Sequence, residues 1–450
     1  MSIVHRKWYL ILGLMILSIL VGACSNGEQS GGEAEKKEEK KSQTADEEQG
    51  TAENPITMTI AYPWDEGQFN ERFGPIDEKL ENLEIKYASY DGSSQGLQEL
   101  FAADVVPDII VSSPTNIAPL EELDAIYPLD DLVEQENFDV GKLNPALVSL
   151  VKGFDSDNRL IGLPDGTGLF ALYYNKEVFD LFGMPYPDPD KPMTWKETLE
   201  IAAKMTAERN GQMYIGLEFG GSGSTGEVAQ VPLKQLATAM TDRETGEVLI
   251  TEKSEFKSYL ELMKDYYSIP GMRSKTAIEN EMFAQKKAAM VINWHNYLAY
   301  GWGDLAYQEK MDLAPVPVWE DKPTTGPYLG TATMVVTTYS KNKLSAFHVL
   351  EEYLSTDNQI NIVKTMASGP AVIEPEVLKE FGSELDQYAT RDTSVFFALE
   401  PATFEKYSHL DRYVNLDLQK FAESDADIPT FLRETKEEAE AAIAEAGASN

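Results

Sequence analysis

Aromatic residues near the ends of predicted strands are the side chains of this sequence best suited to recognising a small molecule. They fall at strand ends or in loops and do not form a stripe along a helix. An aromatic face can pack against the C–H groups of a sugar while nearby carboxylates or amides bind its hydroxyl groups. The alternative is that many of these rings only fill hydrophobic space. The set comprises Tyr62, Trp64, Trp294, Tyr297, Trp302, Trp319 and Tyr328.

The sequence lacks the usual signatures of a zinc protease and of a histidine metal site. The chain contains no His-Glu-x-x-His, and its four histidines, at positions 5, 295, 348 and 409, lack metal-ligand spacing. One cysteine cannot form a thiolate metal cluster. The sequence therefore predicts no catalytic residue, no cofactor and no metal site.

Two patterns keep an enzymatic alternative open. Residues 221–226, Gly-Ser-Gly-Ser-Thr-Gly, formally match a dinucleotide-binding fingerprint, but they lie mid-chain and outside an opening βαβ unit, so we interpret them as a loop. The 75 acidic residues always permit some carboxylate pair of the kind that hydrolyses glycosides. No pair stands out, so a surface glycoside hydrolase is an alternative and not the preferred prediction.

The single cysteine closes an apolar segment near the N-terminus. Basic residues at positions 5–7 precede an uncharged run from Trp8 to Ala23, and Cys24 follows Val-Gly-Ala. The run is shorter than the roughly 20 residues of a bilayer-spanning helix, so a secretory signal is favoured. Val21–Cys24 resembles the lipobox of bacterial lipoproteins. The resemblance implies that Cys24 is acylated, for example with palmitate, and anchors the mature chain to the outer face of the bacterial cell membrane.

The composition predicts a folded and strongly acidic protein. Of 450 residues, 42% are hydrophobic and 10% aromatic, as in globular proteins, and the length suggests two lobes of ordinary domain size. A formal charge of -37 repels phosphate backbones, so nucleic acid is not an expected partner. Residues 24–54 are rich in Ser, Gly, Glu and Lys and carry few bulky apolar side chains, so we expect a disordered tether there.

The periodicity of the remaining chain predicts an α/β fold. Strands and helices alternate from residue 56 to residue 111, as in mostly parallel sheets. Later segments continue the mixture. The predicted strands are residues 56–61, 83–87, 107–111, 170–174, 288–292 and 333–337, and the predicted helices are residues 70–82, 95–103, 194–207, 257–267, 343–354 and 432–446.

Several segments follow one another in a recognisable order. They include Ile161–Asp165, Leu172–Phe179, Thr194–Thr198, Phe283–Met290 and Phe347–Ser355. In this order they resemble the extracellular solute-binding proteins of ABC importers, in the group that contains maltose-binding protein. The ordered set carries the resemblance, and no single motif does.

The resemblance implies two α/β lobes with a ligand cleft between them that closes on binding. Crossing segments would lie near residues 163–168, 316–327 and 368–374, and Gly-Pro pairs in the last two suit hinges. The predicted divisions are a signal peptide at residues 1–23, a lipidated linker at 24–54, an N-terminal lobe at 55–165 plus about 325–369, and a C-terminal lobe at 166–324 plus about 370–450.

The resemblance also implies which residues line the cleft. Trp64 follows the first strand and matches the first cleft loop, and Trp294 matches the stacking aromatic of the far lobe. His295 stands where members of the family often have another small or aromatic residue, and a lone histidine more often packs than binds. The full set of predicted ligand-binding residues is Trp64, Asp65, Ser113, Thr115, Asp165, Trp294, His295 and Tyr328.

These expectations combine into a lipid-anchored, monomeric receptor that captures a solute and delivers it to the permease of an ABC importer. An oligosaccharide is the expected cargo, and the capture needs no covalent chemistry. A receptor for peptides, polyols or other polar solutes is the nearest alternative, because fold does not decide cargo. A surface glycoside hydrolase, or an adhesion or scaffold protein without a closable cleft, are the alternatives from other classes.

Overall fold

The computed structural model describes residues 50–113, 116–220, 226–272, 281–300, 305–403, 408–424 and 426–448. They belong to one compact unit, Asp46–Asn450. The predicted signal peptide, Cys24 and most of the predicted tether lie outside the described residues, as do Thr115 and Trp302. Within the described part of the chain, no helix is long and apolar enough to cross a membrane.

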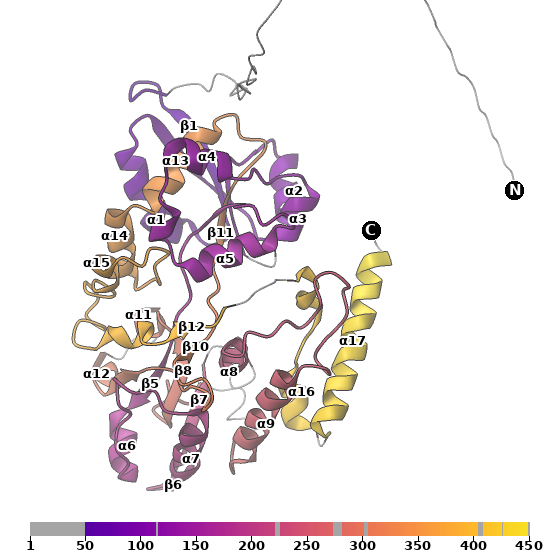
Figure 1. Ribbon diagram of the computed structural model, residues 1–450. Coiled ribbons are helices and arrows are strands. Elements are labelled where there is room, and N and C mark those ends of the chain that lie inside the picture. Colours follow the sequence, from indigo (N-terminus) through magenta and orange to yellow (C-terminus); the bar gives the residue numbers. More distant parts are fainter. Residues whose placement is uncertain are drawn as a thin grey trace, which may run out of the picture. The chain divides into compact units, whose positions relative to one another are not determined.

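The first sheet contains five strands: β1 (Ile56–Tyr62), β2 (Leu83–Ser89), β3 (Ile109–Ser112), β4 (Leu163–Pro164) and β11 (Thr333–Val336). Their order is β2-β1-β3-β11-β4 (Figure 1). β1 pairs in parallel with β2 and β3, with Ile60 opposite Ile109, as the alternation of strands and helices predicts. β11 comes from far along the chain and pairs antiparallel with β3 and β4. All residues of β3 and β11 are buried, which is typical of central strands.

The second sheet also contains five strands: β5 (Phe170–Asn175), β6 (Ala207–Arg209), β7 (Gln212–Phe219), β8 (Ala288–Trp294) and β9 (Met311–Ala314). Their order is β6-β7-β8-β5-β9. β7 and β8 are parallel, whereas β5 runs antiparallel to β8 and β9. The register places Phe170, the first residue of β5, opposite Trp294, the last residue of β8. Two further short strands, β10 (Thr325–Gly326) and β12 (Glu400–Pro401), pair with each other.

Helices connect and cover these strands. The longest are α1 (Glu66–Lys79), α9 (Ser254–Ser268) and α17 (Ile428–Ala448). The others are α2 (Ser94–Ala102), α3 (Ile117–Glu122), α4 (Asp130–Glu136), α5 (Pro145–Phe154), α6 (Lys176–Phe182), α7 (Trp195–Met205), α8 (Val231–Lys234), α11 (Tyr297–Tyr300), α12 (Leu305–Gln308), α13 (Lys343–Tyr353), α14 (Thr356–Met366), α15 (Pro375–Leu378) and α16 (Leu418–Glu423).

The prediction of a mixed α/β fold is confirmed, and the six predicted strands all overlap observed ones. The predicted helix at residues 70–82 begins earlier, at Glu66. The Asp65 carboxylate caps it, because its Oδ1 accepts a hydrogen bond from the Gln68 backbone N at 3.0 Å. The predicted helix at residues 432–446 is α17, which extends further at both ends.

Helix α1 turns one face to the core and another to solvent. Phe69, Phe73 and Ile76, spaced four and three residues apart, are buried. Gln68 and Arg72 are also four residues apart and therefore share an adjacent face of the helix. The residue spacing along α1 therefore places Gln68 and Arg72 beside the buried face and not on it.

Candidate functional site

A cavity of about 790 Å³ is lined by residues from elements of both sheets. Trp64 and Ser113 directly follow β1 and β3 of the first sheet, and Trp294 ends β8 of the second. In α/β proteins, ligands usually bind at the carboxyl ends of strands. Parts of the connecting segments 165–168 and 328–332 complete the lining. We call this space the shared cavity.

Phe170 and Trp294 form an aromatic surface on the second-sheet side of the shared cavity. Their ring centroids are 4.1 Å apart and the rings are inclined by 34°. A Cβ atom on Gly168 would lie only 2.4 Å from Cζ3 of Trp294, so the missing side chain at this position leaves room for the indole. The register of β5 and β8 together with Gly168 therefore fixes the position of Trp294.

Lys234, the last residue of α8, brings a positive charge to this aromatic surface. Its Nζ lies 5.5 to 5.7 Å from three ring centroids, those of Phe170, Trp294 and Tyr328, within the range of cation–π contacts. Nζ also donates a hydrogen bond to Glu227 Oε1 at 2.8 Å. The Lys234 side chain is only 12% exposed, whereas that of Glu227 is 63% exposed. The ammonium is thus held against the rings, and its carboxylate partner faces solvent.

Arg72 of α1 organises the opposite side. Its Nη1 donates to the Tyr353 hydroxyl at 2.8 Å, and its Nη2 donates to Ser368 Oγ at 3.2 Å. Nη1 also lies 4.0 Å from Asp165 Oδ2, in the segment that connects the sheets. Burial raises the pKa of the Asp165 carboxyl above its ordinary value, although the charge of Arg72 acts in the lowering direction. One guanidinium thus joins α1, α13 and two connecting segments beside the shared cavity.

Trp64 is the most exposed ring of the site, with 42% of its surface accessible. Its indole meets the buried Tyr62 ring edge-on at 5.1 Å, and its carbonyl oxygen accepts a hydrogen bond from the Tyr87 hydroxyl at 2.8 Å. Gln68 lies one turn into α1, where its Nε2 donates to Asp65 Oδ2 at 2.7 Å. The helix cap therefore also orients a cavity-lining amide.

His295 is buried and joined to the start of β5. Its backbone N donates to the Leu169 carbonyl at 2.8 Å, and its Nδ1 accepts a hydrogen bond from the Leu169 backbone N at 3.0 Å. The Tyr388 hydroxyl donates to the His295 carbonyl. Nδ1 also lies 3.2 Å from the Leu169 carbonyl oxygen. Burial lowers the pKa of the imidazole to about 4, so the ring is neutral near pH 7. Backbone positioning is the role that these contacts give His295.

The structure brings most of the predicted site residues together. Asp65 is not among the lining residues, because its carboxylate caps α1 and binds Gln68. Thr115 lies outside the described residues, and so does the predicted lipidation site, Cys24. The predicted residues that line the shared cavity are Trp64, Ser113, Asp165, Trp294, His295 and Tyr328.

Sequence reasoning missed several lining residues, among them Gln68, Arg72, Phe170, Glu227 and Lys234. Strand register could have found Phe170, because β5 and β8 were both predicted and their ends meet. The helix phase of α1 could have suggested Gln68 and Arg72 once Phe69 and Phe73 were assigned to the core. No sequence signal marked Glu227 or Lys234, which come from short helical turns.

Residues 45–377 match a family model described as bacterial extracellular solute-binding protein. The chain belongs to this family. A protein of Brucella abortus named as a binding protein is 24% identical over 366 residues, which cover 77% of this chain and 82% of the relative. As an extracellular solute-binding protein, the molecule acts outside the cytoplasm, and the family consists of binding proteins and not of enzymes.

Solved structures of two-lobe binding proteins share the fold of this family member. The sugar-binding protein MalE of Xanthomonas citri superimposes with a TM-score of 0.69 at 15% identity, covering 87% of this chain and 98% of MalE. An ABC substrate-binding protein of Listeria monocytogenes, solved in complex with cycloalternan, superimposes with a TM-score of 0.66 at 15% identity. The match covers 87% of this chain and all of the Listeria protein. The predicted two-lobe α/β architecture is thereby confirmed.

Proposed function

We propose that this solute-binding protein captures an oligosaccharide in the shared cavity and delivers it to an ABC importer. The observation that carries the proposal is the placement of aromatic rings from both sheets around one space. Trp64 comes from the first sheet, and Phe170 and Trp294 come from the second. Sugar rings stack on such surfaces. The Xanthomonas and Listeria neighbours, one a sugar-binding protein and the other bound to cycloalternan, support the same ligand class.

The charges of the shared cavity favour an uncharged, hydroxyl-rich ligand. Among its described lining residues, the charged side chains form two pairs, Arg72 with Asp165 and Lys234 with Glu227. Each cation already lies beside a carboxylate, so an ionic ligand would have to compete with that partner. Sugar hydroxyls can instead donate to the carboxylates and accept from the cations without breaking either pair.

Ligand contacts on both sides would favour a closed arrangement of two lobes. A ligand can shift such an equilibrium only by its difference in affinity for the two states. Trp64 and Trp294 are attached to different sheets, so a ligand that touches both gains contacts on closure. This division of the rings supports capture by closure.

We propose lobe boundaries from strand membership and contacts. β4 belongs to the first sheet and β5 to the second, which supports a first crossing at residues 165–169. The passage from β9 of the second sheet to β11 of the first supports a second crossing. The second segment of the predicted N-terminal lobe, 55–165 plus about 325–369, would then extend beyond residue 369. Asn144 N donates to the Ala371 carbonyl at 2.8 Å, and α15 packs on α14. We therefore propose a third crossing after α15 and before Tyr388.

The test is calorimetric titration of the protein with a panel of oligosaccharides. Trp64→Ala and Trp294→Ala should each weaken binding of a sugar that wild type binds by roughly tenfold or more, because each removes a stacking ring. Tyr186→Ala is the matched control, since Tyr186 is an exposed aromatic residue that follows α6 and does not line the shared cavity. Unchanged affinity in both tryptophan variants would reject the site.

We also propose that binding involves no covalent chemistry and that the mature protein is monomeric and lipid-anchored. The two cavity carboxylates each have a cationic partner, which suits ligand positioning better than proton transfer. Mass spectrometry of sugars recovered after prolonged incubation should show only the starting compounds. Shortened products would support the hydrolase alternative.

A further inference from the structure

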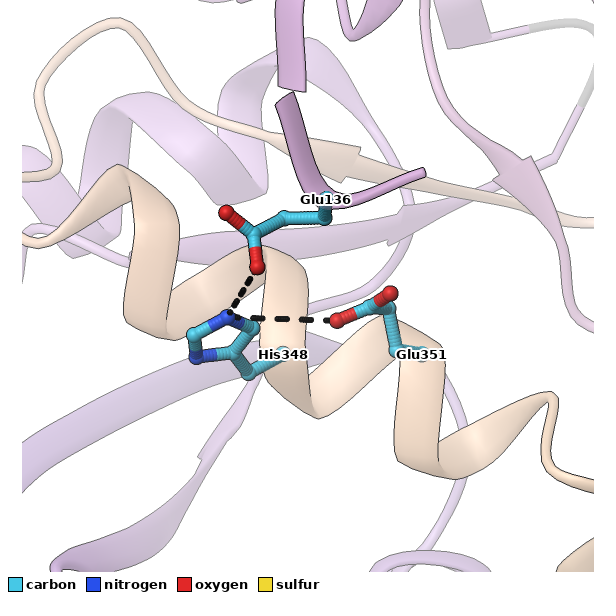
Figure 2. Close-up of side chains that lie close together, drawn as sticks. All are labelled: Glu136, His348 and Glu351. Atoms are coloured by element: carbon cyan, nitrogen blue, oxygen red, sulfur yellow. Dashed lines mark hydrogen bonds and ion pairs between the residues drawn. The ribbon is translucent and has the colours of Figure 1, made fainter. Parts of the chain in front are cut away.

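A histidine and two glutamates meet on the first-sheet side of the molecule, apart from the shared cavity. His348 and Glu351 are three residues apart on α13, and Glu136 ends α4 (Figure 2). His348 Nε2 lies 3.2 Å from Glu136 Oε2 and 3.9 Å from Glu351 Oε2. None of the three lines the shared cavity. We call them the α4–α13 cluster.

The α4–α13 cluster brings three possible ligand atoms close together. Each residue offers one ligand atom, and the three atoms lie within 4.8 Å of one another. Figure 2 shows an oxygen of each carboxylate directed at the same imidazole nitrogen. Tetrahedral zinc with bonds of about 2.0 to 2.1 Å needs donors roughly 3.4 Å apart. The separations of 3.2 and 3.9 Å from His348 Nε2 lie on either side of that value, so small side-chain rotations suffice.

The backbone beneath the cluster is held in place. Phe138 and Phe347, each adjacent or nearly adjacent to a cluster residue, pack edge-on with centroids 5.9 Å apart. Asn137 adopts a left-handed conformation with φ 53°, which ends α4 directly after Glu136. The cluster side chains are partly exposed, 41% for His348 and 25% and 27% for Glu136 and Glu351. A solvated ion can therefore reach a site whose ligands sit on a rigid base.

We propose that the α4–α13 cluster is a binding site for a divalent transition-metal cation of the zinc type. One imidazole nitrogen with two carboxylate oxygens suits zinc and its neighbours, whereas calcium and magnesium take oxygen ligands alone. Water would fill the fourth position. Bound metal would tie the end of α4 to α13 and stabilise this part of the fold, because the ligands come together only in the folded chain.

The test uses the full chain, freed of metal with EDTA and titrated with zinc chloride by calorimetry. Wild type should bind one zinc ion and gain thermal stability. His348→Ala and Glu351→Gln should each weaken zinc binding by at least about tenfold, because each removes a ligand. His409→Ala is the matched control: His409 Nε2 also lies near a carboxylate, Glu121 Oε2 at 3.5 Å, but His409 is not part of the α4–α13 cluster. This variant should bind zinc as wild type does.

Cobalt provides a second readout that does not depend on stability. Visible absorption of the cobalt-loaded protein should show bands of a tetrahedral or five-coordinate site in wild type and lose them in Glu351→Gln. Equal zinc affinity in wild type and His348→Ala would mean an adventitious ion only and would overturn the proposal. So would the absence of saturable zinc binding in wild type, or loss of binding in His409→Ala alone.

Discussion

Trp294 is positioned by a neighbour that has no side chain. The Gly168 backbone lies against the indole, and a methyl group there would come within 2.4 Å of Cζ3. A contact so short cannot persist, and the atom that it meets belongs to a rigid ring. The affinity of the shared cavity therefore depends on a residue that offers no functional group.

Gly168→Ala should displace the Trp294 ring and weaken binding of a cavity ligand by about tenfold, or about 1.4 kcal/mol. Titration calorimetry and tryptophan fluorescence measure the two effects. Gly330→Ala is the control, because a Cβ at this other lining glycine meets no atom within 4 Å. If both variants bind equally well, the steric argument for Gly168 is wrong.

Glu218 is a buried carboxyl of β7 that makes stability depend on pH. Burial raises its pKa to about 8, although the Phe283 backbone N donates to Oε2 at 2.7 Å and lowers it. The folded state therefore retains a proton that the unfolded state releases above about pH 4.5. The protonated Glu218 carboxyl contributes to the free energy of unfolding below about pH 4.5, and this contribution is lost as the pH rises toward 8.

Glu218→Gln should remove this loss, because an amide oxygen can accept the same hydrogen bond without ionising. Between pH 4.5 and pH 7, the free energy of unfolding of wild type should fall by up to about 3 kcal/mol more than that of the variant. Urea unfolding of both proteins at these two pH values measures it. Parallel pH profiles would show that Glu218 is not the responsible group.

At the scale of elements, the start of α1 serves both the helix and the site. Asp65 caps the helix through the Gln68 backbone and binds the Gln68 side chain, which lines the shared cavity. The first-turn carboxylate also suits the positive end of the helix dipole. Asp65 thus acts on the ligand site through Gln68 and not by lining the cavity.

Asp65→Ala should lower the free energy of unfolding by about 1 kcal/mol and also weaken ligand binding several-fold. Asp427→Ala is the control, since the Asp427 carboxylate caps α17 by accepting from Thr430 N at 2.8 Å and lies far along the chain. Denaturation should show similar losses for both variants, while calorimetry should show weaker binding only for Asp65→Ala. Equal ligand affinity in the two variants would show that Gln68 does not contribute to ligand binding.

Sequence reasoning performed best where strands end and least well where helices turn. Trp64, Ser113 and Trp294 follow or end strands that hydrophobic patterning predicts, so their place at the cavity could be anticipated. Lys234 reaches the rings from a four-residue helix, which is too short for helical periodicity to show which side chains face the cavity. The α4–α13 cluster was missed because spacing rules look along the chain, whereas Glu136 and His348 are 212 residues apart.

At the scale of the whole molecule, the proposed lipid anchor bears on where captured ligand goes. The family places the protein outside the cytoplasm, and the sequence places Cys24 behind an apolar leader. A lipid-modified N-terminus with a tether would keep the binding unit near its importer. Without it, the receptor and its ligand would diffuse away.

Cys24→Ala should release the protein from the membrane fraction and lower uptake of the transported sugar in cells. Fractionation followed by immunoblotting and uptake of labelled sugar measure these two effects. Ligand affinity of the purified variant should stay at the wild-type value, because the cysteine lies before the folded unit. A variant that stays membrane-associated with full uptake would contradict lipid anchoring.

The place of β11 in the first sheet has a consequence for the order of events in folding. This strand lies between β3 and β4, yet it leaves the ribosome only after every strand of the second sheet. Until β11 has been synthesised, the edges of β3 and β4 that it joins have no strand between them, and the first sheet stays incomplete. The first sheet begins nearer the N-terminus, but it can be completed only after the strands of the second sheet have been made.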